Sequence, residues 1–216
     1  MNSDSILKQD LFGTIEQHKT SEGVFFIRRN THLAHANIAW LARKLLRREQ
    51  QALKHLKDLA SVPRLLRSSK TQLERSWIDG ASMHIAKPTQ PIYFREAMRL
   101  LRLIHAKNIT HNDLAKETNW LVTQSGLPAL IDFQLASHSP RRGCWFKMLA
   151  HNDIRHLLKH KRSYIPTLLT ARECRILAQP SMISQLWGHT YKPIYWFITR
   201  NILKWSDREG AGDRKK

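Results

Sequence analysis

Two long stretches of the chain repeat apolar residues at steps of three and four, the spacing of one face of an α-helix. They cover residues 38–56 and residues 91–109. Their apolar stripes consist of Leu41, Ala42, Leu45, Leu46, Ala52, Leu53 and Leu56 in the first stretch, and Phe94, Ala97, Met98, Leu101 and Ile104 in the second. A capping box, Thr170-x-x-Glu173, predicts a shorter helix over residues 171–178. A further helix is predicted to begin at Asp153.

Short apolar runs bounded by polar or glycine-containing turns predict β-strands around these helices. Three pairs of strands are predicted in this way: residues 11–29 turning at 20–23, residues 65–78 turning at 68–70, and residues 120–122 with 129–131 turning at Ser125-Gly126. The second strand of the first pair, 24–28, is apolar enough to be buried. Helices and antiparallel strands in this order predict an α+β fold.

One carboxylate falls on the apolar stripe of the first helix. Glu49 lies four residues after Leu45 and four before Leu53. Because a buried carboxylate is unfavourable unless it meets a cation, we expect a partner from the preceding strand, Arg28 or Arg29. The alternative is a rim position in which Glu49 pairs with a neighbour on its own helix.

Three oxygen-bearing side chains surround the hairpin of residues 120–131. Asn119 precedes its first strand, Asp132 follows its second, and Asp113 lies on the loop before it. If Val122 pairs with Ala129, counting places Asn119 opposite Asp132. An amide oxygen and a carboxylate facing each other suit a hard cation, and Asp113 is a candidate base beside them. The alternative is a hairpin whose polar ends are merely solvated.

The triplet His111-Asn112-Asp113, then Asn119 before a strand, then Asp132-Phe133, resembles the catalytic and metal-binding segments of the protein-kinase-like superfamily. Within it the sequence is most similar to the small bacterial Rio-like and lipopolysaccharide (Kdo/heptose) kinases. Two features differ from the usual pattern. The spacing from Asp113 to Asn119 is one residue longer, and Gln134 stands where glycine usually follows Asp-Phe.

The resemblance implies a compact bilobal kinase-like fold. Residues 1–79 would form the N-lobe, a small β-sheet with one helix, and residues 80–205 a mostly helical C-lobe with the catalytic loop. Residues 206–216 are expected to be a disordered polar tail. The order of the predicted elements agrees with this superfamily throughout.

The resemblance also implies roles in phosphoryl transfer from ATP. Asp113 would orient and deprotonate the acceptor hydroxyl, with Lys116 near the transferred phosphate, although a surface lysine is an equal alternative. Asn119 and Asp132 would hold Mg²⁺. His111 belongs to this catalytic group as the ring that supports the turn presenting Asp113.

The nucleotide itself would lie between the lobes. Glu49 takes the role of the glutamate that positions ATP, with Arg28 where a lysine is expected, and Trp77-Ile78 would contact the adenine at the hinge. A glycine-rich phosphate loop is not present, because only Gly13 and Gly23 occur in the first 79 residues. Asp153 would brace the catalytic loop.

Charge sets this chain apart from an average soluble protein. Its 36 Lys and Arg residues against 17 Asp and Glu give a net charge of +19. Such a field attracts polyanions, including an acidic membrane face, a phosphorylated glycolipid or nucleic acid. A basic helical face (Arg43, Lys44, Arg47, Arg48 and Lys54) and an aromatic, basic segment from Ser184 add to it. The alternative for the basic face is that it is merely solvated, and the alternative for the aromatic segment is a helix that completes the core.

Two further features bear on where the protein acts and on whether it binds a metal through histidines. No secretory signal or membrane span is recognised, so we expect a cytoplasmic protein that could also contact the inner membrane face. His151, His156 and His160 invite a metal site, but a solvated basic helix is the preferred interpretation.

The resulting hypothesis is an ATP- and Mg²⁺-dependent phosphotransferase that acts on a hydroxyl of a lipopolysaccharide sugar or a protein Ser/Thr. The alternative is a pseudokinase, a nucleotide-binding or regulatory module. A specific nucleic-acid binder is disfavoured, because no recognised nucleic-acid motif is present.

Overall fold

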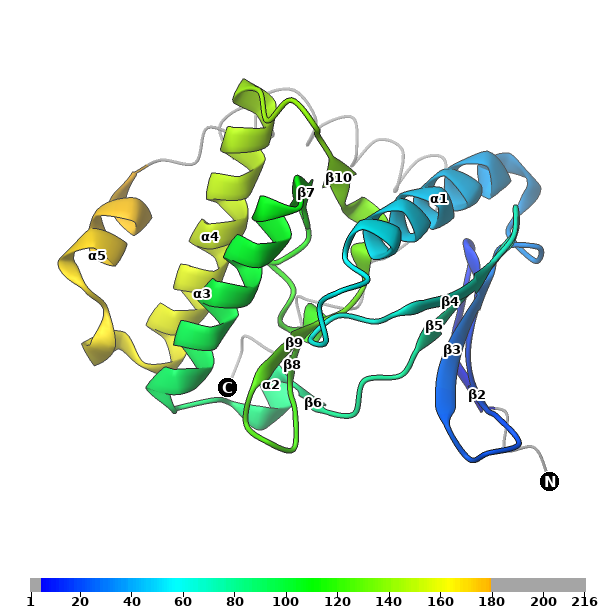
Figure 1. Cartoon of the computed structure of the whole chain (residues 1–216), viewed down its shortest axis with the longest axis horizontal. Coiled ribbons are helices and arrows are strands. Elements are labelled where there is room, and N and C mark those ends of the chain that lie inside the picture. The colour runs from blue at the N-terminus through cyan, green and yellow to red at the C-terminus, as the bar shows by residue number, and fades with distance from the viewer. Residues whose placement is uncertain (1–4, 180–216) are drawn as a thin grey trace. The chain divides into compact units, whose positions relative to one another are not determined.

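A five-stranded antiparallel sheet is formed by the chain between Ser5 and Ser76 (Figure 1). The computed structural model describes residues 5–179. The strands are β1 (Ser5–Asp10), β2 (Gly13–Lys19), β3 (Phe25–Asn30), β4 (Leu65–Ser68) and β5 (Gln72–Ser76), in the order β1-β2-β3-β5-β4. The sheet therefore contains the predicted pairs β2–β3 and β4–β5, and adds β1, which the sequence analysis did not predict.

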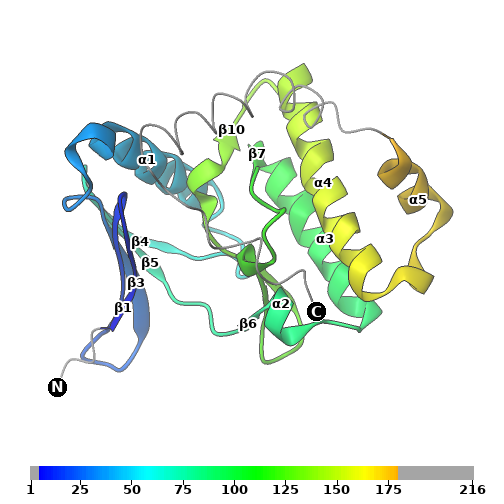
Figure 2. The same cartoon turned by 180° about the vertical axis from the view of Figure 1, so that it is seen from behind.

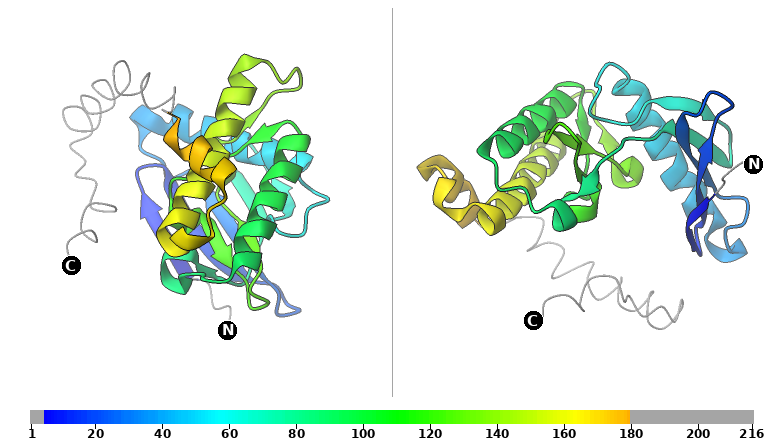
Figure 3. Two further views of the ribbon diagram at one scale, coloured as in Figure 1. Left: turned by 90° about the vertical axis from the view of Figure 1, so that its left-hand side faces the viewer. Right: turned by 90° about the horizontal axis from the view of Figure 1, so that it is seen from below.

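Helix α1 (Ala39–His55) follows the short 3-10 helix η1 (Ala36–Ile38) and lies along the sheet (Figures 1 and 3). It packs against β4 and β5 and against the 3-10 helix η3 (Phe133–Leu135). Its buried residues are Ala42, Leu46, Glu49, Ala52 and Leu53. The predicted helix and its buried carboxylate are both confirmed.

The rest of the described chain is mostly helical. Its helices are α2 (Met83–Ala86), α3 (Pro91–Ala106), α4 (Cys144–Tyr164) and α5 (Ala171–Ala178), with η2 (Glu117–Asn119) and η4 (Pro166–Leu168). Two small antiparallel sheets accompany them, β6 (Ala81–Ser82) with β8 (Trp120–Val122) and β9 (Pro128–Leu130), and β7 (Ile109–Thr110) with β10 (Ser137–His138). Helices α3 and α4 run side by side (Figures 1 and 2).

The core links both parts of the fold. Leu46 and Leu53 of α1, Leu73 of β5, Leu101 of α3 and Leu157 of α4 belong to one cluster of buried residues. Residues through Leu177 form one compact unit, and the second unit, from Ala178, lies almost entirely outside the described residues. The predicted aromatic segment from Ser184 and the polar tail 206–216 are among the residues not described.

Several predicted boundaries were wrong. Strand β3 begins at Phe25 and alternates, with Ile27 and Arg29 buried but Val24 and Phe25 exposed, so it is not a wholly buried strand. Helix α3 ends at Ala106 because Asn108 adopts a left-handed conformation, φ 61°, that leads into β7.

Helix α4 contains Asp153 in its interior instead of beginning there. It is not a solvated basic helix either, because Leu157, Leu158 and His160 are buried. No helix within residues 5–179 is long and apolar enough to cross a membrane.

Gly13 and Gly126 offer a matched pair of left-handed turns with different surroundings. A Cβ at Gly13 (φ +119°) would lie 2.0 Å from Asn30 O, whereas one at Gly126 (φ +74°) would meet nothing within 4 Å. We expect Gly13→Ala to lower the free energy of unfolding by roughly 2–4 kcal/mol and Gly126→Ala by about 1 kcal/mol. Urea denaturation measures both. Equal losses would show that the backbone contact at Gly13 relaxes freely.

Candidate active site

A buried carboxylate holds the loop that carries Asp113. Asp153, on α4, is fully buried. Its Oδ2 accepts from the backbone N of His111 at 2.8 Å and from His105 Nε2 at 3.1 Å, and its Oδ1 accepts from the backbone N of Asn112 at 2.9 Å. The bracing role predicted for Asp153 is therefore confirmed. With two backbone donors on one carboxylate, the loop has little freedom to move.

His111 supports the same loop from inside. It is fully buried, its Nε2 donates to Ile131 O at 3.0 Å, and its ring lies 4.7 Å from the ring of Phe133. The imidazole connects the loop to the segment after β9. The structure thus places His111 as a positioning residue, consistent with the expected support of the turn.

Asp113, Lys116 and Asn119 form a small cluster. Asn119 Nδ2 donates to Asp113 Oδ2 at 3.1 Å and to Asp113 O at 2.9 Å. Lys116 Nζ lies 3.0 Å from Asp113 Oδ2, and the Lys116 side chain is 61% exposed. The longer loop between Asp113 and Asn119 thus still brings the two side chains together.

The hairpin register differs by one residue from the prediction. Val122 pairs with Pro128, so Asn119 faces Ile131, whose backbone N donates to Asn119 O at 3.0 Å. The loop sets this register, because Thr123 N donates to Leu127 O at 2.9 Å and Thr123 Oγ1 also bonds Leu127. Asp132 is therefore one position beyond the predicted pair.

Asp132 and Asn119 nevertheless line the same cavity, which receives side chains from the sheet and from the helical part of the fold. Asp132 adopts a left-handed conformation, φ 66° and ψ 69°, which ends the strand and turns the chain. Its Oδ1 is buried and has no hydrogen-bond partner among residues 5–179. A buried carboxylate oxygen without a donor is unfavourable unless a cation completes it.

Asn119 and Asp132 fit a hard divalent cation, since both offer oxygen ligands and one of these oxygens lacks a partner. The histidine alternative has no support: within the described part of the chain, no group of three His, Cys, Asp or Glu residues could hold a metal. His160 instead packs inside, with its Nε2 donating to Leu114 O at 2.7 Å.

The partner of Glu49 is not Arg28. Glu49 Oε2 lies 3.5 Å from Arg29 Nη1, and its Oε1 lies 3.2 Å from Arg75 Nε. Arg28 points to the other side of the sheet, where it pairs with Glu74 at 2.9–3.0 Å. Consecutive residues of a strand face opposite sides, so only one of Arg28 and Arg29 can reach α1.

Sequence reasoning missed Arg75 altogether. A signal was present in β5, because Leu73 is buried and Arg75 stands two residues later on the same face. The cross-strand pair Ile27–Arg75 then places it beside β3.

A cavity of about 260 Å³ lies beside these residues and receives side chains from both parts of the fold. Trp77, Ile78 and Gly80 line it at the predicted hinge. Its remaining lining consists of Leu7, Lys8, Ile15, Ile27, Arg75, Ser76, Thr118, Asn119, Leu121, Ile131, Asp132 and Gln134. We call it the inter-lobe cleft. It combines an apolar interior with a polar end at Asn119 and Asp132.

The turn between β1 and β2 is too short to form a phosphate cradle. Asp10 pairs with Gly13, which leaves only Leu11 and Phe12 in the turn, and the Phe12 backbone N already donates to Asp10 Oδ1 at 2.8 Å. The sequence lacks a glycine-rich loop here, and the structure has a two-residue turn in its place.

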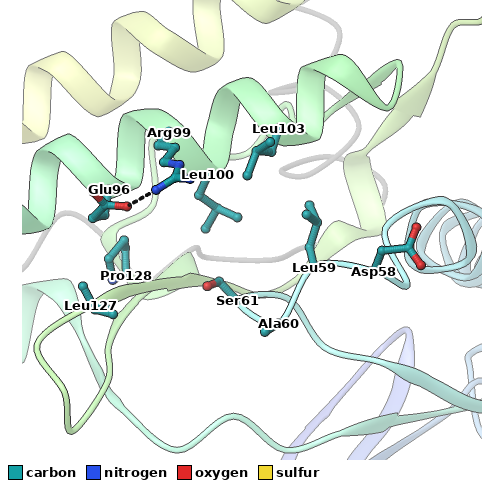
Figure 4. Close-up of a pocket in the computed structure, with 10 residues that line it drawn as sticks. All are labelled: Asp58, Leu59, Ala60, Ser61, Glu96, Arg99, Leu100, Leu103, Leu127 and Pro128. Atoms are coloured by element: carbon teal, nitrogen blue, oxygen red, sulfur yellow. Dashed lines mark ion pairs between the residues drawn. The ribbon is translucent and has the colours of Figure 1, made fainter.

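A second cavity, of about 210 Å³, lies between α3, the segment after α1 and the β8–β9 loop (Figure 4). Leucines from all three contribute to it. Its charged groups are paired, Arg99 with Glu96 at 3.6 Å and Asp58 with Lys107 at 3.0 Å. It offers none of the chemistry found in the inter-lobe cleft.

Comparison with known proteins places this geometry in a fold family. No protein-family model and no curated protein matches the sequence. Among solved structures, the Rio2 kinase from Chaetomium thermophilum matches with a TM-score of 0.59 and 14% identity, over 80% of this chain and 60% of that chain. The protein therefore has the bilobal protein-kinase-like fold, and it spans less than two thirds of the length of that kinase. The finer resemblance to lipopolysaccharide kinases stays a prediction.

Glu49 and Glu74 form a matched pair for testing the buried ion cluster. Glu49→Gln would leave two nearly buried guanidinium groups without a counterion, so we expect a loss of about 3–5 kcal/mol in the free energy of unfolding. Glu74→Gln leaves the half-exposed Arg28 and should cost less than about 1 kcal/mol. Urea titrations of both variants provide the measurement. A small loss in Glu49→Gln would contradict the shared ion pair.

His156 on α4 should make stability depend on pH. Burial, and then the nearby Lys159, lower the pKa of His156 to about 4. The unfolded chain binds this proton near pH 6.5, so stability is full above pH 6.5 and falls as the pH decreases toward 4. Between pH 7 and pH 5 we expect a loss of about 1–2 kcal/mol.

His156→Gln should reduce that pH dependence, whereas His151→Gln, at an exposed position of the same helix, should leave it unchanged. Urea unfolding at the two pH values tests this. The same slope in wild type and His156→Gln would assign the pH dependence to other groups.

Proposed function

We propose that this protein is an ATP- and Mg²⁺-dependent phosphotransferase. One observation carries the proposal: Asn119 and Asp132 line one end of the inter-lobe cleft, Asn119 is hydrogen-bonded to Asp113, and the buried Oδ1 of Asp132 lacks a partner among the described residues. An oxygen site for a cation next to a carboxylate that can accept a proton is the arrangement that phosphoryl transfer requires. The kinase-like fold supports it.

Asn119 and Asp132 would hold Mg²⁺ through their side-chain oxygens. When bound, the ion neutralises charge on the phosphates of ATP. Asn119 also donates to Asp113, so the metal site and the base are linked by a direct hydrogen bond.

Asp113 accepts the proton of the acceptor hydroxyl while the oxygen of that hydroxyl bonds to the γ-phosphorus. The bond from the γ-phosphorus to the bridging oxygen breaks, and ADP leaves. Lys116, 3.0 Å from Asp113 Oδ2, orients the carboxylate and adds positive charge near the transferred group. His111 and Asp153 keep the loop in place.

The nucleotide base would enter the apolar part of the cleft. Ile27, Leu121 and Ile131 provide apolar surface there, and Trp77 and Ile78 offer the hinge backbone to the adenine. Glu49, expected to position the nucleotide, does not itself line the cleft; it is held by Arg29 and Arg75 instead of Arg28, and would act on the nucleotide through Arg75.

The acceptor would be anionic, such as the hydroxyl of a lipopolysaccharide sugar, with a protein Ser/Thr as the alternative. The net charge of +19 supports this choice. So does α1, whose exposed face presents Arg43, Lys44, Arg47 and Lys54 beside the exposed Trp40. A basic face with a tryptophan suits peripheral contact with an acidic membrane surface that carries such an acceptor.

A pseudokinase is the second candidate. The two-residue turn between β1 and β2 and the arginine in place of the usual lysine favour nucleotide binding without transfer. The retained Asp113, Asn119 and Asp132 favour transfer.

Asp132→Ala tests the catalytic assignment. Because Oδ1 has no hydrogen-bond partner among residues 5–179, the variant should unfold at a similar temperature to wild type, while Mg²⁺-dependent ATP turnover falls roughly 10³-fold or more. The turnover assay contains either purified lipopolysaccharide or an acidic protein substrate with Ser and Thr residues, and ADP release is measured. The control, Asp58→Ala, removes an exposed carboxylate outside the cleft and should keep full turnover.

Normal turnover in Asp132→Ala would remove the metal assignment. Wild-type protein that binds ATP but releases no ADP with either acceptor would favour the pseudokinase.

A further inference from the structure

The inter-lobe cleft lacks two of the devices by which such a cleft usually holds phosphates. The turn between β1 and β2 has no free amide cradle, since the Phe12 amide is bound by the Asp10 carboxylate. The cationic side chain of β3 that faces α1, Arg29, also does not reach the cleft. Arg29 is only 8% exposed, is held by Glu49, and is not among the residues that line the cleft.

Among the residues that the structure describes, two cationic side chains line the cleft, Lys8 and Arg75. Lys8 lies 3.5 Å from Asp10, so its charge is matched. Arg75 stands opposite Ile27, which forms part of the apolar lining, and Glu49 holds its guanidinium through Nε at 3.2 Å. A guanidinium held at Nε keeps its planar fork in a defined orientation.

The charges of this cluster do not balance. Within the described residues, Arg29 and Arg75 form ion pairs with the same carboxylate, Glu49, and with no other acidic group. The three side chains are 8%, 12% and 2% exposed and carry a net charge of +1. A nearly buried excess charge is unfavourable until an anion neutralises it, and Arg75 is the member that faces the cleft.

Building on the proposed function, we infer that Arg75 of β5 is the side chain that binds the nucleotide phosphates. Glu49 and Arg29 act as positioning residues: Glu49 orients Arg75, and Arg29 compensates the charge of Glu49. The cation expected from the strand next to α1 thus comes from the strand that leads into the hinge.

The cluster itself provides a variant that should fold. Arg75→Met removes the excess charge and leaves Glu49 paired with Arg29, so no buried charge loses its counterion. We expect its melting temperature to stay within a few degrees of wild type. Arg67→Met, at an exposed position of the neighbouring strand β4, is the matched control.

The experiment compares Mg·ADP with adenosine by isothermal titration calorimetry. Wild type should bind ADP more tightly than adenosine. Arg75→Met should weaken ADP binding roughly 10–100-fold and change adenosine binding less than about threefold, because only ADP carries phosphates. Arg75→Lys should recover part of the ADP affinity, and Arg67→Met should match wild type.

Two results would overturn the inference while leaving the proposed function intact. One is a folded Arg75→Met that binds ADP as wild type does. The other is an equal loss of ADP and adenosine, which would assign Arg75 to the base. Wild-type protein that binds neither ligand would overturn the proposed function along with the inference.

Discussion

The structure around the site depends on one buried carboxylate. Asp153 receives hydrogen bonds from His105 on α3 and from two backbone amides of the loop before β8, while its own backbone belongs to α4. A fully buried carboxylate that lost these donors would be strongly unfavourable, so α3, α4 and the loop are constrained to one arrangement. The positions of Asp113 and Asn119 follow from this constraint.

Glu49 plays the corresponding part in the N-terminal sheet. It joins α1 to two strands that are neighbours in space but 46 positions apart in sequence, through Arg29 and Arg75. The two carboxylates act on different sides of the cleft. One fixes the loop where a hydroxyl would be activated, and the other fixes the wall where an anion would bind.

Sequence reasoning was most successful where one pattern excluded its alternatives. The long amphipathic helices were predictable from their apolar spacing, and the buried position of Glu49 was predictable because a charged residue inside an apolar stripe demands a partner. The bracing role of Asp153 was expected only from the resemblance to kinase-like proteins. Sequence reasoning failed where a shift of one residue leaves the pattern equally plausible. Phe-Phe-Ile-Arg-Arg-Asn contains an apolar residue and an arginine on both faces, so alternation alone could not choose between Arg28 and Arg29. The β8–β9 register was set by the hydrogen bonds of Thr123. The spacing from Leu73 puts Arg75 on the inner face of β5, but only the pairing of β5 with β3 places it beside Glu49.

The two arginines that share Glu49 have a consequence for folding itself. Any anion that neutralises their excess charge binds only the folded chain, where the cluster exists, and therefore stabilises it in proportion to the logarithm of the anion concentration. The native population of this protein would then depend on the supply of its own ligand. Its resistance to unfolding and to proteolysis would then increase with the concentration of phosphate-bearing ligand, independently of any catalytic activity.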